Sequence, residues 1–130
     1  MATEKEQVQE FLSIVGKSLH QYVESIDFDA LSAAKKLIFD AEAKGGRLHV
    51  TGIGKPGHVS GYAASLFSST GTPTYELHGT ECVHGSAGQT RPGDVVIAIS
   101  NSGETGELKA TVTCLKNVGV HIIALTGYPN

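Results

Sequence analysis

The sequence has few cysteines, no long apolar run and no cluster of basic residues, and each absence excludes a class of protein. Two cysteines, Cys82 and Cys114, are too few for a disulfide-stabilised secreted scaffold, which favours the reduced cytoplasm. Apolar stretches such as Val95–Ile99 and His121–Leu125 are far shorter than a bilayer span, and the polar residues 1–6 lack the apolar core of a secretory signal. The ten basic residues are scattered over a chain of net charge -3. We therefore predict neither a membrane nor a nucleic-acid partner.

What the composition does contain is typical of one globular domain. Hydrophobic residues make up 40% of the 130 residues and charged residues 18%, a balance that disfavours disorder. The 16 glycines are the unusual feature, and several of them fall between Gly45 and Gly106. The chemistry is expected in that part of the chain.

Two amphipathic helices are predicted at the start of the chain. Residues 5–26 carry apolar side chains at steps of three and four, which indicates one buried stripe. Asp27 or Asp29 is placed to cap a second helix, which Gly45-Gly46 would end. We predict that residues 1–46 form a helical pair packing on a domain of residues 47–130.

From Arg47 the pattern changes to short apolar runs that alternate with helical segments. This alternation is typical of βαβ units, so the predicted fold class is α/β, a three-layer sandwich whose mostly parallel sheet is covered by helices. The predicted strands are Leu48–Ile53, Pro73–Leu77, Asp94–Ile99 and His121–Thr126, and the predicted helices are Pro56–Ser69 and Glu104–Val118.

The sequence stops directly after the fourth predicted strand, at Asn130. A parallel sheet ending there would leave one edge exposed. We expect a domain that is incomplete, truncated after the fourth strand, or one that a neighbour completes.

The first candidate loop, residues 52–58, follows the first strand directly. Glycines such as Gly54 allow a ligand to approach the backbone, Lys55 adds a positive charge, and His58 lies at the start of the next helix. The segment also fits GxGxxG, the phosphate-binding fingerprint of dinucleotide folds. The acidic residue that this fingerprint needs after the second strand has only Glu76 as a candidate, so NAD binding stays an alternative. A plain tight turn is the other alternative.

The second candidate loop, Ser100–Thr105, brings three hydroxyls and a glycine to the start of a helix. Hydroxyls, backbone N–H groups and the helix dipole together suit a phosphate monoester. A capping box would explain one hydroxyl but not three. The carboxylate of Glu104 would repel a phosphate, yet it is suited to moving a proton on a sugar carbon chain.

These loops resemble the sugar isomerase (SIS) domain family, whose fold is a flavodoxin-like α/β sandwich. Residues 100–105 match the family's SxSGxT phosphate signature. The resemblance covers about Arg47 to Asn130 and is strongest toward the arabinose 5-phosphate isomerase branch. Further matching segments are Thr51–Lys55, Gly71–Pro73, His78–Gly85 and Pro92–Ser100.

The resemblance implies an aldose–ketose isomerase that interconverts arabinose 5-phosphate and ribulose 5-phosphate through an enediol. It implies that the phosphate is held by Ser100, Ser102 and Thr105, and that Lys55 and Glu104 are catalytic. Substrate-binding roles are also expected for Gly54, His58 and Asn101, and no cofactor is expected.

The chain departs from the family pattern at three places. Pro56 stands where relatives usually carry serine, and Ser86 where they usually carry aspartate. The glutamate and histidine that relatives carry after the fourth strand fall beyond Asn130. These departures keep a second function open, in which the domain binds a phosphosugar as a sensor without turning it over.

Metal binding and assembly complete the expectations. Relatives can bind zinc near His78, Glu81 and His84, whose steps of three would place them on one side of a helical turn. We predict no metal, with these three as weak candidates. His49 and His121 fall in or beside strands and are expected to pack. The resemblance also implies a homodimer or homotetramer, with a sugar phosphate as the small-molecule partner.

Overall fold

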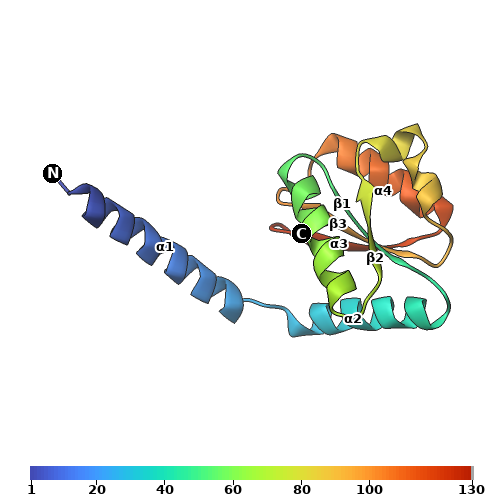
Figure 1. Ribbon diagram of the computed structural model, residues 1–130, viewed down its shortest axis with the longest axis horizontal. Coiled ribbons are helices and arrows are strands. Elements are labelled where there is room, and N and C mark those ends of the chain that lie inside the picture. The colour runs from blue at the N-terminus through green and yellow to red at the C-terminus, as the bar shows by residue number, and fades with distance from the viewer. Residues whose placement is uncertain (130) are drawn as a thin grey trace. The chain divides into compact units, whose positions relative to one another are not determined.

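The computed structural model describes residues 1–129, and Figure 1 shows how their helices and strands follow one another. The chain divides into two compact units, Met1–Ala33 and the remainder from Ala34 onward. The two units are described separately below. None of the helices in the described part of the chain is both long and apolar enough to cross a bilayer.

The first unit holds α1 (Glu4–Glu24) and the beginning of α2 (Phe28–Ala43). Thr3 and Glu6 form a capping box, in which each side chain accepts from the other residue's backbone N–H. At α2 the Asp27 carboxylate accepts from the Ala30 N–H, so Asp27 is the capping residue of the two predicted alternatives. Both helices predicted at the start of the chain are confirmed.

The second unit is built on a sheet of four parallel strands in the order β2-β1-β3-β4. This confirms the predicted α/β fold with a parallel sheet. Every strand boundary lies within two residues of its prediction. The strands are β1 (Leu48–Gly52), β2 (Thr74–His78), β3 (Val95–Ser100) and β4 (His121–Thr126).

Helices cover both faces of this sheet, as α3 and α4 show on opposite sides of the strands in Figure 1. On one face, Ala41 of α2 and Phe67 of α3 (Lys55–Ser69) pack against Leu48 and Val95. On the other face, Leu115 of α4 (Gly106–Val118) packs with residues that include Leu77, Val96 and Cys82. The alternation of side chains along each strand divides the apolar residues between these two cores.

Two details differ from the predictions. The connection from β2 to β3 contains two short 3-10 helices, Glu81–His84 and Ser86–Gln89. The last helix begins at Gly106 and not at Glu104, because Thr105 has an extended backbone and caps the helix while Gly103 takes a φ of +70°. Glu104 therefore lies in the loop before α4.

Candidate functional site

The two candidate loops meet at the carboxyl ends of β1 and β3. These strands are neighbours, and Gly52 at the end of β1 is in register with Ile99 near the end of β3. From this pair the chain continues outward in opposite directions, to β2 on one side and to β4 on the other. In open parallel sheets such a reversal opens a crevice at the carboxyl ends of the strands, where ligands bind.

A cavity of about 260 Å³ occupies this position. It brings together four of the predicted site residues, which form its polar side, with an apolar wall from both loops and from α4. The polar residues are Ser100, Asn101, Ser102 and Thr105, and the apolar ones are Ile53, Pro56, Ile99 and Leu108. The strand order explains the meeting of the two loops, which are far apart in the sequence.

Internal hydrogen bonds hold the Ser100–Thr105 loop in shape. The Ser100 hydroxyl oxygen accepts from the Gly103 N–H at 3.0 Å, and the Ser102 oxygen accepts from the Glu104 N–H at 3.1 Å. Each serine uses an acceptor position in this way, so its O–H remains able to donate to an anion. The loop is thus held in shape, and the two serines that line the cavity each keep a free donor.

The start of α4 adds backbone donors to the same place. Thr105 caps the helix without a side-chain hydrogen bond to it, and the first intrahelical bond runs from the Lys109 N–H to the Thr105 carbonyl. The N–H groups of the first turn, residues 106–108, therefore have no partner within the helix. They and the positive end of the helix dipole favour an anion at the cavity.

The start of α3 offers fewer donors. Pro56 has no N–H, and the Gly57 N–H is bonded to the Gly54 carbonyl at 3.0 Å. The tight turn depends on glycine, because a Cβ on Gly52 would lie 2.7 Å from the Pro56 carbonyl carbon and Gly54 has a φ of +73°. The start of α4 therefore has more free backbone donors for an anion than the start of α3.

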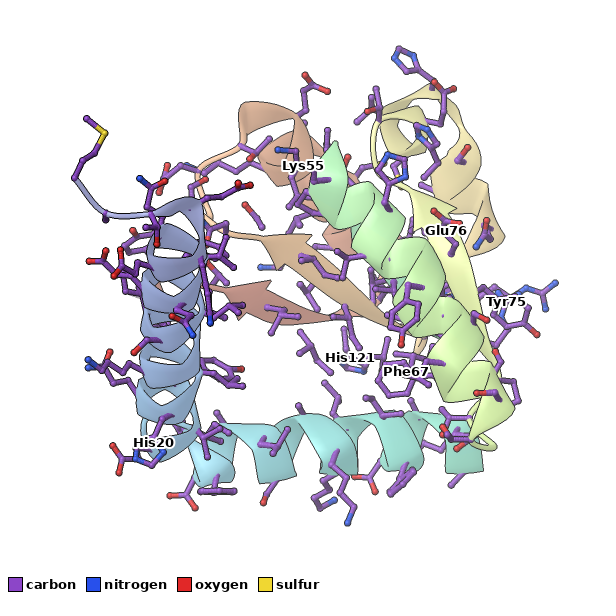
Figure 2. The ribbon with its side chains drawn as sticks, turned by 60° about the vertical axis from the view of Figure 1, so that its left-hand side comes forward. His20, Lys55, Phe67, Tyr75, Glu76 and His121 are labelled. Atoms are coloured by element: carbon purple, nitrogen blue, oxygen red, sulfur yellow. The ribbon has the colours of Figure 1, made fainter. Side chains whose placement is uncertain are left out.

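The other predicted site residues lie around the cavity rather than in its wall. Gly54, Lys55 and His58 are exposed at the start of α3, and Figure 2 shows Lys55 at that end of the helix. Glu104 is exposed and its carboxylate pairs with the Lys109 ammonium of α4. The chain thus places a cation and a carboxylate at the rim, on the two loops that the cavity joins.

The metal candidates do not come together. Glu81 donates its backbone N–H to the His78 Nδ1 at 3.2 Å, which uses one ring nitrogen in a local turn. Within residues 1–129, no three His, Cys, Asp or Glu side chains gather closely enough to hold a metal ion. His78, Glu81 and His84 are therefore not a three-ligand site in this arrangement.

Glu76, the acidic residue that dinucleotide binding would need, is not placed to contact a ribose. Glu76 lies in the middle of β2, two residues before the strand ends at His78. Its carboxylate packs against α3, where a Cβ added to Gly61 would lie 3.0 Å from the Glu76 Oε2. The side chain therefore covers a helix and does not face the crevice as a ribose partner would.

The apolar wall of the cavity was not predicted from the sequence. Ile53, Ile99 and Leu108 look like ordinary core residues, and Pro56 looks like the start of a helix. Ile53 and Ile99 immediately adjoin the two polar loops, and that adjacency was the available signal. The strand order needed to bring them together is visible only in the folded chain.

Comparison with known proteins shows which family and which proteins this chain resembles. The model of the SIS domain family matches residues 42–130. The arabinose 5-phosphate isomerase KdsD of Shigella flexneri is 48% identical over 84 residues, which is 65% of this chain and 26% of that protein. The chain thus spans about a quarter of the length of this curated relative.

Solved structures share the architecture. The Escherichia coli CFT073 protein c3406, in complex with arabinose 5-phosphate, matches with a TM-score of 0.77 and 35% identity over 96% of this chain and 66% of that chain. The phosphoheptose isomerase GmhA of Neisseria gonorrhoeae matches with a TM-score of 0.77, covering 95% of this chain and 75% of its own. At 19% identity, the second similarity establishes the fold alone.

Proposed function

The chain belongs to the SIS domain family, and on that premise we propose that it is a sugar-phosphate isomerase domain that interconverts an aldose and a ketose phosphate through an enediol. The arabinose 5-phosphate/ribulose 5-phosphate pair is the proposed substrate. The Shigella flexneri relative carries the name of that activity, and the c3406 structure contains arabinose 5-phosphate.

One observation carries the proposal: the cavity at the ends of β1 and β3 gathers the hydroxyls of Ser100, Ser102 and Thr105 beside the start of α4. A phosphate in this position would accept from the three hydroxyls and from the first-turn N–H groups of the helix. The apolar wall of Ile53 and Pro56 excludes water from one side. Holding the phosphate there fixes the distance of the sugar carbons from the loops.

The rim residues supply the proposed chemistry. Glu104 removes the proton from C2 of the aldose and returns a proton to C1, which converts the enediol intermediate to the ketose. Lys55 stabilises the negative charge on the substrate oxygens as the enediolate forms. Both side chains are long and exposed, so they are free to turn toward a bound sugar. Gly54, His58 and Asn101 are proposed to complete the substrate contacts.

A sensor that binds the phosphosugar without turnover is the second candidate. The observation that favours it is the placement of Lys55 and Glu104 outside the cavity wall, with the Glu104 carboxylate paired to Lys109. In this case the phosphate-binding loop would do all the work, and the rim residues would be dispensable for binding.

Arabinose 5-phosphate in D2O, followed by proton NMR with the protein present, separates the two candidates. Loss of the C2 proton signal and growth of ribulose 5-phosphate signals would support the isomerase. Line broadening of the sugar without exchange would support the sensor for this chain. If the sugar shows no exchange and no line broadening, both candidates are excluded.

We propose a cytoplasmic homodimer or homotetramer as the working form. In α1, apolar side chains are exposed along one helix, and a second copy would cover them. They include Val8, Phe11, Leu12, Val15, Leu19, Tyr22 and Val23. A monomer by light scattering at micromolar concentration would contradict this part of the proposal.

A further inference from the structure

A second cavity, lined by charged residues, lies at the amino ends of the strands, opposite the Ser100–Thr105 loop. Its volume is about 610 Å³, and four basic side chains line it, those of Lys44, Arg47, Arg91 and His121. Arg47 directly precedes β1, and His121 begins β4. In Figure 2, Lys55 marks one end of α3, and His121 lies well away from it, toward the other end of that helix. We infer that this cavity binds a small phosphate-bearing anion, separately from the Ser100–Thr105 loop.

Asp94 holds three of the basic residues in place through their backbones. Its carboxylate accepts from the N–H of Arg47 and the N–H of Arg91, each at 2.9 Å. Its carbonyl accepts from the His121 N–H at 2.8 Å. Residues from three separate connections are thereby fixed around one buried residue, so the cavity is formed before any ligand arrives.

Close backbone packing stiffens the same region. A Cβ on Gly46 would lie 2.7 Å from the Gly93 carbonyl oxygen and 2.9 Å from the Ala41 oxygen. The Gly93 N–H in turn donates to the Gly119 carbonyl at 3.0 Å. These contacts lock the connections that lead into β1, β3 and β4. Preorganisation of this kind reduces the entropy cost of binding.

The charges at the cavity leave an excess of positive groups. The Arg47 guanidinium pairs with the Asp94 carboxylate at 3.0 Å, and the Asp40 carboxylate pairs with Lys36. Both acidic side chains of the cavity wall are therefore already balanced. Within residues 1–129, neither Lys44 nor Arg91 forms an ion pair, and both side chains belong to exposed residues. In a chain of net charge -3, two such cations among the residues that line one cavity favour an anion there.

The shape limits the ligand to a small molecule. The cavity matches the size of common small-molecule sites, and Leu37, Ala41 and Pro92 give it an apolar side. Guanidinium and ammonium groups are the usual partners of phosphate oxygens. The six residues of β3 separate this cavity from the Ser100 loop by about 20 Å, so both can be occupied at once.

Titration with inorganic pyrophosphate, followed by ¹H–¹⁵N NMR at constant ionic strength, tests the site. We expect saturable shifts of the Arg47, Arg91 and His121 amides. A Lys44→Ala/Arg91→Ala variant should weaken this binding at least about tenfold. Arg91→Ala keeps the backbone N–H that donates to Asp94, and Lys44→Ala keeps the N–H that donates to the Ala41 carbonyl, so the fold should survive. The control variant Lys17→Ala removes a positive charge from α1, outside the residues that line the cavity, and should leave the affinity for pyrophosphate unchanged.

Several results would overturn the inference. They are the absence of saturable shifts at these amides, shifts that sodium chloride reproduces at equal ionic strength, and unchanged affinity in the double variant. The outcome is independent of the proposed function, because binding of arabinose 5-phosphate at the Ser100–Thr105 loop is read from a separate set of amides, those of residues 100–106. Failure of that second set of shifts alone would count against the proposed function and leave the new site standing.

Discussion

The imidazole Nε2 of His49 lies 3.0 Å from the Asp94 Oδ2, and both side chains are buried, at 0% and 3% exposure. The pair joins β1 to the residue before β3. The other ring nitrogen of His49, Nδ1, lies 3.2 Å from the Gln89 Nε2, which also donates to the Glu76 carbonyl. A neutral imidazole with its proton on Nε2 satisfies this arrangement, donating to Asp94 and accepting from Gln89.

Replacing Asp94 with alanine should strongly destabilise the second unit. The carboxylate accepts from two backbone N–H groups, from the Arg47 guanidinium and from His49, and its loss leaves buried donors without partners. Removing one member of a buried charged network costs about 3–5 kcal/mol. Urea unfolding should report this decrease in the free energy of unfolding. Asp40→Ala, at an exposed ion pair, should cost far less, and equal losses for both variants would refute the assignment.

The fold should lose stability in mild acid because of His49. Burial lowers the pKa of the imidazole, and this outweighs the nearby Asp94 carboxylate, which raises it. Since the pKa in the folded state is below the ordinary 6.5, the unfolded chain binds the proton more readily. The contribution of His49 is therefore complete above pH 6.5 and is lost as the pH falls through the folded pKa.

The measurement is the free energy of unfolding between pH 7.5 and 4.5 (about three pH units), with a slope of at most about 1.4 kcal/mol per unit from one histidine. Asp94 contributes in a lower window. Burial alone would raise the pKa of its carboxyl, but the hydrogen bonds from Arg91, Arg47 and His49 hold it below the ordinary value of 3.8. His49→Gln should therefore flatten the slope below pH 6.5. An identical slope in this variant would show that another group is responsible.

The fold was predictable because its signals are local. Runs such as Val95–Ile99 are apolar on both faces, as a strand buried between helices requires, and glycine or polar loops separate them. The helix start at Glu104 was wrong by two residues, because nothing local distinguishes a loop carboxylate from a first-turn carboxylate. The positive φ of Gly103 and the extended Thr105 decide the boundary.

The site was predictable only where its residues are contiguous. Ser100, Asn101, Ser102 and Thr105 share one loop, so their convergence needs no tertiary information. The opposing wall at Ile53 depends on β1 lying next to β3, which the sequence does not specify. His49 was expected to pack passively, since its partner Asp94 lies 45 residues away in the chain. Contacts between residues so far apart in the sequence are known only once the strands are paired in register.

The hydroxyls of the Ser100–Thr105 loop should be required for ligand binding. Ser102→Ala with Thr105→Val removes two of the three donors at the cavity while keeping the size of the side chains similar. We expect binding of arabinose 5-phosphate to weaken by about tenfold or more, because charge-assisted hydrogen bonds contribute about 1.5–3 kcal/mol each. Isothermal titration calorimetry measures the change. Ser69→Ala, whose hydroxyl donates to Leu66 at the far end of α3, is the matched control. Unchanged affinity in the double variant would place the phosphate elsewhere.

Glu104→Gln should separate catalysis from binding. If Glu104 transfers the proton between C1 and C2, the amide should lower turnover by about 10²–10⁴-fold and leave the affinity for the sugar phosphate intact. Glu107→Gln removes the neighbouring acidic side chain, in the first turn of α4, and should retain turnover. The assay is the rate of ribulose 5-phosphate formation at saturating substrate. Equal turnover in both variants would remove Glu104 from the catalytic group.

The two cysteines should differ sharply in reactivity. Burial, with a smaller contribution from Cys114, raises the pKa of the Cys82 thiol to about 11. At pH 8 only about one molecule in a thousand would carry the reactive thiolate at this position, and the side chain is also inaccessible in the core. Cys114 is only partly buried. A disulfide reagent should therefore modify Cys114 first and reach Cys82 only after unfolding.

The Cys114→Ser variant isolates the buried thiol. In this variant the rate of modification should follow the free energy of unfolding as urea is added, since the folded state protects Cys82. The raised pKa has a second consequence, because deprotonation favours the unfolded chain once the pH exceeds the ordinary thiol value of 9.0. Stability should fall above pH 9, and Cys82→Ala should reduce that fall. Rapid modification of Cys82 in the folded Cys114→Ser protein would contradict the buried placement.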